Sequence, residues 1–405
     1  MGEKKNKKSA LVPRLRFPVF REAGNWAEIT LGEIGEIVTG KTPSTSDDSL
    51  WNGGIQFVTP TDISEEKYQW KTQRSVTGNA NTKVLPLHSV MFTCIASIGK
   101  MALSVKPCIT NQQINSLIPN KDYETEFIYY SLLNIVPLIK GTQANSTLPI
   151  INKKEFSKFT VPVPKLHKEQ QQIADCLSSL DELITAETQK LDALKAYKKG
   201  LMQQLFPREG ETVPRLRFPE FRDAGGWEEK TVGEVFRVTR GEVLAMPRVK
   251  DTPSADFPYP VYSSQTKNNG LAGYYSEYLY EDAITWTTDG ANAGEVNFRS
   301  GKFYCTNVCG VLLNSQGSAN AFVAALLNSV TRKYVSYVGN PKLMNGVMSE
   351  IVIPFPSLPE QQRITDLLSS LDDLITAQNH KISALKTHKK GLMQQLFPVL
   401  DEAPA

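Results

Sequence analysis

One stretch of the chain matches a pattern that binds nucleotide phosphates. Residues 35 to 42 fit G-x-x-x-x-G-K-[ST], in which backbone amides surround the phosphates and Lys41 would neutralise their charge. That chemistry requires a loop between a strand and a helix. Here Ile37 and Val38 favour a strand, and Pro43 opens a run of Ser, Thr and Asp with no helical pattern. We interpret the match as accidental. The opposite hypothesis, a nucleotide-binding loop, predicts that the isolated chain binds ATP and that Lys41→Ala loses this binding.

The other reactive side chains follow no catalytic or metal-binding pattern. The cysteines and histidines are scattered, at Cys94, Cys108, Cys176, Cys305, Cys309, His88, His167, His380 and His388. Cys305 and Cys309 are close in sequence, but no further ligand follows at zinc spacing, so we expect reduced thiols and no metal. The sequence also lacks a dinucleotide turn, a nucleophile elbow and a distinctive carboxylate pair. We therefore predict no catalytic residue and favour binding over catalysis.

The composition is that of a globular protein with several domains. A length of 405 residues suggests two or three domains, and 40% hydrophobic with 21% charged residues excludes a disordered chain. The net charge of +3 gives no argument for nucleic-acid binding from bulk charge, so any such site must be local. Residues 1–11 form a basic tail without an apolar stretch, and no run is long enough to span a bilayer. We expect a cytoplasmic protein.

The chain contains an internal repeat. Residues 12–34 return as 213–235, with an offset of 201. A second block, which ends at Pro207, returns with its end at Pro398, with an offset of 191. The segments between these blocks have diverged. A repeated frame around two different inserts predicts one scaffold that carries two different surfaces.

The second repeated block has the heptad pattern of a long helix. Its expected seam consists of Leu177, Leu180, Ile184, Leu191, Leu194, Leu201 and Leu205, and of Leu368, Leu371, Ile375, Ile382, Leu385, Leu392 and Leu396 in the second copy. Polar residues interrupt both seams at equivalent places, Glu187 with Gln378 and Lys198 with Lys389. We predict that the two helices pair antiparallel with pseudo-twofold symmetry. The alternative is that each helix docks separately on its own domain.

The predicted fold is mixed α/β, with two globular domains joined by two long helices in an antiparallel coiled coil. The boundaries that we expect are 1–11 for the tail, 12–165 and 208–356 for the domains, 166–207 and 357–398 for the helices, and 399–405 for a second tail. Strand character is seen at 55–60, 90–99, 283–288 and 302–313, and helix character at 126–134 and 321–330. A capping box at Ser357 and Glu360 predicts a sharp start for the second helix, and its lack in the first copy predicts a less defined start there.

Several motifs carry a family likeness. Both long helices open with E-Q-Q-x-I, at 169–173 and 360–364, before L-S-S-L-D. The first insert contains G-K-T-P at 40–43, W-N-G-G-I at 51–55 and T-P-T-D-I at 59–63. It also contains S-I-G-K at 97–100 and T-N-Q-Q at 110–113. In these motifs the chain resembles the specificity subunit of type I restriction–modification systems, over essentially all of its length after the tail.

The resemblance implies a DNA-recognition subunit with two target recognition domains and no activity of its own. Each domain would read one half of a split, asymmetric target in double-stranded DNA. The helices would set the spacer and dock two modification subunits, which methylate adenine with S-adenosylmethionine. Motor–nuclease restriction subunits that use ATP and Mg would complete the assembly in a bacterial or archaeal cytoplasm. The alternative is a coiled-coil scaffold that presents two protein-binding domains and does not bind DNA.

Recognition of bases requires donors and acceptors at base edges, with cations on phosphates. In the first domain the candidates are Lys41, Thr42, Ser44, Thr45, Thr59, Thr61, Lys71, Arg74, Ser97, Lys100, Asn111, Gln112 and Gln113. In the second domain they are Ser263, Ser264, Gln265, Lys267, Asn268, Asn269, Thr288, Asp289, Asn292, Asn307, Asn340 and Lys342. For each one the alternative is an ordinary polar turn residue or a buried amide. We expect Trp26, Trp51 and Trp227 to pack rather than to stack on bases.

Overall fold

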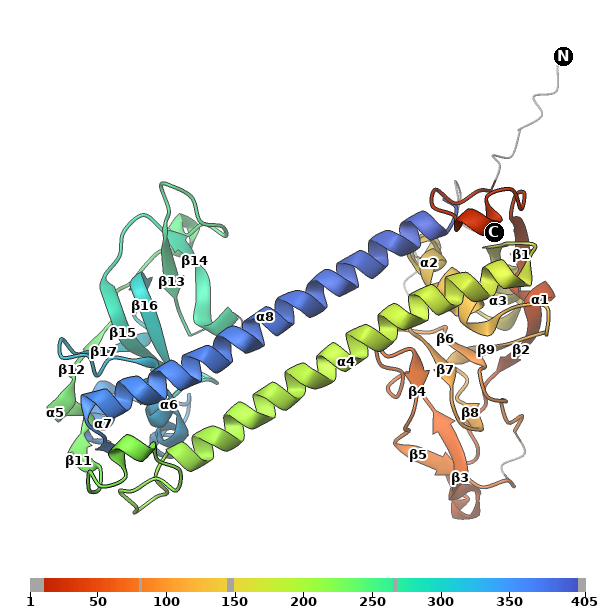
Figure 1. The fold of residues 1–405 in the computed structure, drawn as a ribbon. Coiled ribbons are helices and arrows are strands. Elements are labelled where there is room, and N and C mark those ends of the chain that lie inside the picture. The colour runs from red at the N-terminus through yellow and green to blue at the C-terminus, as the bar shows by residue number, and fades with distance from the viewer. Residues whose placement is uncertain (1–10, 80–81, 144–148, 265–267, 400–405) are drawn as a thin grey trace. The chain divides into compact units, whose positions relative to one another are not determined.

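A computed structural model describes residues 11–79, 82–143, 149–264 and 268–399. The chain divides into two compact units (Figure 1). Unit 1 combines Met1–Thr188 with His380–Ala405, and unit 2 is Gln189–Asn379. Each unit therefore holds one insert together with one part of each long helix.

Unit 1 is built from three sheets and a few short helices. Its strands are β1 (Ala27–Thr30), β2 (Gly35–Thr39), β3 (Trp51–Val58), β4 (Tyr68–Gln69), β5 (Arg74–Val76), β6 (Val90–Thr93), β7 (Met101–Ser104), β8 (Cys108–Thr110), β9 (Ile114–Pro119) and β10 (Thr160–Val163). Its shorter helices are α1 (Leu31–Ile34), α2 (Thr125–Gln143) and α3 (Lys153–Lys158), with 3-10 turns η1 (Pro18–Phe20) and η2 (Asp48–Leu50). The sheet orders are β2-β9-β6-β7-β4, β5-β3-β8 and β1-β10.

The five-stranded sheet of unit 1 is buried on both faces. Phe92 on one face packs with Phe127 of α2, in a core that also takes in the start of the helix α4. Met91 on the opposite face packs with Val58 of the three-stranded sheet. Strands β6 and β7 are therefore apolar at nearly every position, as expected for strands without a solvent face.

Unit 2 follows the same plan with different strands. They are β11 (Glu228–Thr231), β12 (Arg237–Arg240), β13 (Tyr259–Tyr262), β14 (Leu271–Tyr275), β15 (Tyr280–Thr287), β16 (Val296–Cys305), β17 (Cys309–Leu313) and β18 (Val352–Phe355). The helices are α5 (Val232–Val235), α6 (Ala321–Val330) and α7 (Asn345–Glu350), with 3-10 turns η3 (Pro219–Phe221), η4 (Met246–Arg248), η5 (Asn268–Gly270) and η6 (Thr331–Tyr334). The sheet orders are β12-β17-β15-β16-β13-β14 and β11-β18, and α6 packs on Trp286 and Leu312 of the larger sheet.

The two long helices are α4 (His167–Leu205) and α8 (Leu358–Leu396), of 39 residues each. They begin and end at equivalent positions of the repeat, so the expectation of a less defined start for the first helix is wrong. The carboxylate of Glu360 binds Arg217 with both oxygens, an ion pair in place of the expected capping role. A buried arginine, equivalent in the two copies, explains why both starts are equally well fixed.

The helices run antiparallel, as predicted. In unit 1, Asp181 and Glu187 of α4 contact Lys389 and Lys381 of α8, each at 2.5 Å between nitrogen and oxygen. The partner number falls as the α4 number rises, which is the signature of antiparallel helices. In unit 2, Lys198 contacts Asp372 at 2.5 Å, and this pair is the repeat equivalent of Lys389 with Asp181. All the expected seam residues are buried or half-buried.

The repeated frame forms the same joint in each unit. Arg16 binds both carboxylate oxygens of Glu169, at 2.7 Å each, and Arg217 binds Glu360 at 2.7 and 2.8 Å. Both arginines are buried, and each also donates to a backbone carbonyl of its own segment, of Gly24 or of the equivalent Gly225. The joint fixes the segment before each domain to the start of a long helix.

The opposite ends of the long helices close the two cores with equivalent aromatic trios. In unit 1, Trp26 packs edge-on against Phe127 of α2 and against Phe397 after α8. In unit 2, Trp227 packs edge-on against Phe322 of α6, which contacts Phe206 after α4. Burial of Trp26 and Trp227 to 4% and 3% exposure confirms that they are packing residues.

Candidate functional site

The first cluster of predicted residues lies where two parallel strands end. Strands β3 and β8 pair in parallel, with Val58 opposite Thr110. The turn that follows β3 and the segment 111–113 that follows β8 are therefore neighbours, and Asn111 N donates to the carbonyl of Val58 at 3.0 Å. Carboxyl ends of parallel strands meet at one edge, so residues far apart in sequence form one surface.

The loop 41–45 lies against the same segment. Gly40 makes this approach possible, because a Cβ there would lie 2.1 Å from the carbonyl oxygen of Asn111. Lys41 N donates to Thr110 O at 2.8 Å, and the hydroxyl of Thr42 donates to Oε1 of Gln112 at 2.7 Å. The side chains of Lys41, Ser44, Thr45 and Gln112 are exposed. The structure thus brings together the loop and the amide run.

Two predicted base readers make hydrogen bonds within their own turns. Asn111 is 8% exposed, and its amide exchanges hydrogen bonds with the backbone N–H and the side chain of Gln113. The hydroxyl of Thr59 donates to Asp62, whose other oxygen accepts from the Gln73 backbone. These contacts hold the shape of the cluster.

Arg74 and Trp51 form a stacked pair at the side of this cluster. The Arg74 guanidinium carbon lies 3.5 Å from the centroid of the Trp51 ring, and Trp51 Nε1 donates to Ser44 O at 2.9 Å. Trp51 is buried at 6% exposure, as expected for a packing residue. Arg74, Thr61 and Lys71 stay exposed near the turn after β3.

Ser97 and Lys100 occupy a separate turn between β6 and β7. The carbonyls of both residues accept from Thr93, and Gly99 between them packs on Val136 of α2. A Cβ on Gly99 would lie 2.6 Å from that valine, and its φ of +86° also favours glycine. The contacts of this turn run to α2, whereas the loop and amide cluster is held by β3 and β8.

The phosphate-loop match is a strand. Residues Gly35–Thr39 form β2 and pair with β9, so their backbone groups are used in the ladder. The next helical residues form the short turn η2 at Asp48–Leu50. This geometry has no helix N-terminus behind Lys41 to receive phosphates.

The second cluster gathers around the turn that follows β15. Thr288 hydroxyl donates to Asp289 at 2.7 Å and also lies 3.0 Å from Val308 O, in the turn between β16 and β17. The Leu343 backbone N–H donates to Thr288 O at 2.9 Å, which brings in the segment that carries Lys342. Lys342 Nζ lies 3.9 Å from Asp289. The turn after β15, the turn between β16 and β17 and the segment that carries Lys342 thus meet at Thr288 and Asp289.

Arg240, at the end of β12, completes this cluster and was missed by the sequence prediction. Its Nε donates to Asn307 O at 2.6 Å, and its Nη2 lies 3.7 Å from Asp289. A signal existed, because Arg240 precedes Gly241, the repeat equivalent of Gly40. A Cβ on Gly241 would lie 2.4 Å from the carbonyl oxygen of Cys305, so both glycines allow the same close approach.

The amide-rich run before β14 is only partly described. Ser263 accepts from the hydroxyl of Thr306 at 3.0 Å, which places it beside Asn307. Asn268 and Asn269 are exposed in η5 with positive φ, and Ser264 is half-exposed. Gln265 and Lys267 lie outside the described residues. Asn292 and Asn340 are on the turns that flank Asp289, with Asn340 exposed.

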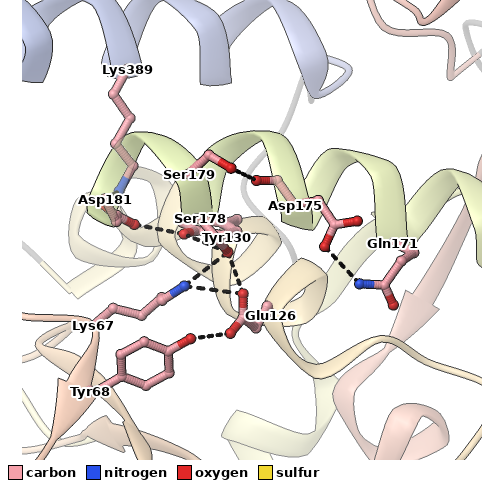
Figure 2. A network of polar contacts seen from close by, with 10 residues as sticks. All are labelled: Lys67, Tyr68, Glu126, Tyr130, Gln171, Asp175, Ser178, Ser179, Asp181 and Lys389. Carbon is pink, nitrogen blue, oxygen red and sulfur yellow. Dashed lines mark hydrogen bonds and ion pairs between the residues drawn. The ribbon is translucent and has the colours of Figure 1, made fainter. Parts of the chain in front are cut away.

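A buried polar network fixes the first insert to the long helices (Figure 2). Lys67, whose side chain is 4% exposed, contacts Glu126 of α2 and Ser178 of α4. Tyr130 donates to Asp181 at 2.6 Å, and Asp181 also binds Lys389 of α8. Hydrogen bonds that involve charged side chains therefore connect the first domain, through Lys67 and α2, to both long helices.

The network sets the charge state of Glu126. Burial raises the pKa of this carboxyl, but hydrogen bonds from Ser178, Tyr68 and Lys67 together outweigh burial, and its pKa lies below the ordinary value. The carboxylate is thus ionised at neutral pH and pairs with the buried ammonium of Lys67.

Four of the five cysteines, Cys94, Cys108, Cys305 and Cys309, are buried thiols, and Cys176 is half-buried. Burial raises the pKa of Cys94 and Cys108 to about 12, and that of Cys309 to about 11. A protonated thiol is a poor nucleophile and a poor metal ligand. In the described part of the chain, no group of three or more His, Cys, Asp or Glu residues could hold a metal ion, and no helix is long and apolar enough to cross a membrane.

Comparison with known protein families identifies the repeated unit. The family model described as type I restriction modification DNA specificity domain matches twice, at residues 23–196 and 224–387. The chain belongs to this DNA specificity family. Each match begins in the repeated frame and ends within a long helix, so the family domain corresponds to the duplicated unit found in the sequence.

Two curated specificity subunits are similar to the chain over most of their lengths. The MjaIX specificity subunit of Methanocaldococcus jannaschii is 26% identical over 401 residues, which cover 92% of each chain. The EcoprrI specificity subunit of Escherichia coli is 24% identical over 362 residues, 85% of this chain and 87% of that one. The crystal structure of a type I S subunit from M. genitalium has the same fold, with a TM-score of 0.64 at 17% identity, and covers 96% of this chain and 100% of that one.

The structure explains the E-Q-Q-x-I motif that opens both helices of this specificity-family chain. The Glu is the carboxylate of the buried joint, and Ile173 and Ile364 enter the two cores. The first Gln of each motif, Gln170 or Gln361, bonds to a proline carbonyl before its helix and to the N-terminal end of α2 or α6. The motif is therefore a connection between helix and domain.

Proposed function

We propose that this chain is the DNA-recognition subunit of a type I restriction–modification complex that reads a bipartite, asymmetric target. Each insert would read one half-site. The observation that supports this proposal most directly is the pair of DNA specificity domains in one chain, set in one frame but carrying different polar clusters. A family of specificity domains supplies recognition, so methyltransferase and nuclease activities are assigned to other subunits.

The two clusters differ in their chemistry. Around Gln112 the first combines amides and hydroxyls with the exposed cation Lys41, and amides pair well with adenine. Around Asp289 the second is charged, with Arg240 and Lys342 on one carboxylate. Two surfaces of different chemistry support a target with two different halves. The candidate residues above are thus proposed as DNA contacts, with Asn111 and Thr59 proposed to shape the surface.

We propose residues 12–165 and 208–356 as the two target recognition domains and the helices at 166–207 and 357–398 as the spacer element. At ~1.5 Å per residue, the 39 residues of each helix give about 58 Å of length. Half-sites one turn of DNA apart are separated by ~34 Å, which such a helix can span.

The proposed partners are double-stranded DNA, two modification subunits and motor–nuclease subunits, in the cytoplasm of a bacterium or archaeon. S-adenosylmethionine, ATP and Mg would be bound by those partners. One solved relative of the fold, at a TM-score of 0.57, comes from work on complex assembly in a type I R-M system. It covers 92% of this chain at 15% identity.

The test is single-molecule sequencing of N6-methyladenine in cells that express this chain together with its modification subunit. Cells that express the modification subunit alone are the control. A split, asymmetric motif that depends on this chain is expected. An assembled, catalytically intact complex without any motif would contradict the proposal and favour a scaffold that binds proteins.

A further inference from the structure

The guanidinium of Arg240 is held on two sides. Nε donates to the carbonyl of Asn307 at 2.6 Å, and Nη2 lies 3.7 Å from Oδ2 of Asp289. Asn307 is in the turn between β16 and β17, and Asp289 follows β15. An arginine positioned by neighbouring elements loses little side-chain freedom when it binds a ligand.

The outer edge of this guanidinium is available to a ligand. Asn307 occupies the donor on Nε, and the distance to Asp289 is that of an ion pair without a hydrogen bond. The donors on Nη1 and Nη2 have no hydrogen-bond partner among the described residues, and 43% of the side chain is exposed. Two parallel N–H donors are the arrangement that binds O6 and N7 of guanine.

The charges around Arg240 suit a site on DNA. Asp289 is shared by Arg240 and by Lys342, whose Nζ lies 3.9 Å from Oδ1. One carboxylate between two cations leaves the cluster net positive, so the phosphates of DNA are not repelled. The carboxylate orients the arginine without cancelling the charge of the cluster.

The first domain has a different residue at the equivalent place. Thr39 occupies the position of Arg240 in the repeat, and its hydroxyl donates to Asn115 at 2.7 Å. The Thr39 hydroxyl is bonded within its own sheet, and threonine has no pair of parallel N–H donors. Of these two equivalent positions, only the one in the second domain holds an arginine that is fixed by its neighbours.

We propose that Arg240 determines specificity by reading a guanine in the half-site of the second domain. The inference rests on the proposed function and adds to it the base and the residue. Asp289 and the Asn307 carbonyl act as positioning groups. A simple phosphate contact by Arg240 is the competing outcome.

The test uses the full chain with its modification subunit, carrying Arg240→Lys or Arg240→Gln. Adenine methylation is mapped across the genome for each variant. One guanine position in one half of the motif is expected to become degenerate, with its preference reduced on the order of tenfold or more. The other half and the spacer are expected to stay unchanged. Lysine keeps the charge but lacks the planar fork, so it is expected to lose the preference as glutamine does.

Arg237→Gln is the matched control, because Arg237 is an exposed arginine on the same strand. Its motif is expected to equal that of the wild-type chain. A full motif with Arg240→Lys, or loss of all methylation with Arg240→Gln that lysine restores, would identify a phosphate contact and overturn the inference. An unchanged motif in both variants would overturn it while leaving the proposed function intact. Failure of the wild-type chain to give a split motif would overturn both.

Discussion

At the scale of single residues, two equivalent buried ion pairs, Arg16 with Glu169 and Arg217 with Glu360, connect the domains to the long helices. Arg217 and Glu360 are 7% and 1% exposed, and their bidentate contact satisfies two buried charges at once. Hydrogen bonding to Glu360 raises the pKa of Arg217. A buried pair adds little stability over an apolar substitute, but breaking it leaves a charge without a partner.

Arg217→Met is therefore expected to lower the free energy of unfolding by about 3–5 kcal/mol, because Glu360 is left buried and unpaired. Urea unfolding of the full chain measures this. Lys333→Met removes an exposed pair with Glu209 and is the control, with an expected change of about 0–1 kcal/mol. Equal effects of the two substitutions would contradict the assignment of Arg217 to a buried joint.

The Glu126 carboxylate makes stability depend on pH. Its pKa is lowered in the folded chain, so its contribution is present above the pKa of the unfolded chain, about 4.3, and is lost as the pH falls through the lower folded value. Glu126→Gln is expected to be less stable than the wild-type chain at pH 7, with a difference that shrinks below about pH 4. Unfolding curves at both pH values measure the difference. A gap that is constant with pH would exclude the ionised carboxylate as its cause.

At the scale of elements, the long helices contribute to each domain core as well as to their own seam. Leu396 of α8 is 1% exposed in the core of unit 1, whereas Leu374 of the same helix is 54% exposed. A heptad pattern predicts which positions face inward, but it does not tell whether they meet the partner helix or a domain. Near its end, α8 contacts both the partner helix α4 and the core of unit 1.

Leu396→Ala is expected to lower the free energy of unfolding by about 2–5 kcal/mol, because it leaves a cavity in a packed core. Leu374→Ala is the matched control and should have a small effect. Thermal or urea unfolding compares the two. If both variants unfold alike, the end of α8 is not part of a core.

The sequence predicted elements better than it predicted the site. The helix α6 lies at 321–330 as expected, and α4 and α8 were found from their heptads. The run 302–313 was expected as one strand, but a turn divides it into β16 and β17. Arg240 was missed because its partners Asn307 and Asp289 are distant in sequence and meet only through strand pairing.

At the scale of the molecule, the duplicated frame stabilises each of the two units, whereas the inserts that it carries are proposed to determine DNA specificity. The joints, aromatic trios and seam are equivalent in both units, while the polar clusters differ in side chains, as at the equivalent positions Thr39 and Arg240. Exchange of residues 236–356 for the corresponding insert of another specificity subunit is therefore expected to change one half of the methylated motif and to preserve the other half. Methylome sequencing measures both halves in one experiment. A well-folded hybrid with an unchanged motif would contradict this division.

The core of unit 1 has a consequence for how the protein is made. Trp26 and Phe127 near the start of the chain pack against Phe397, which leaves the ribosome long after them. Unit 2, by contrast, is one continuous stretch from Gln189 to Asn379. Unit 1 is therefore completed only after unit 2 has been translated, and the apolar surface around Trp26 and Phe127 stays uncovered until Phe397 has been synthesised. Nascent chains of this protein should need a chaperone for the first domain more than for the second.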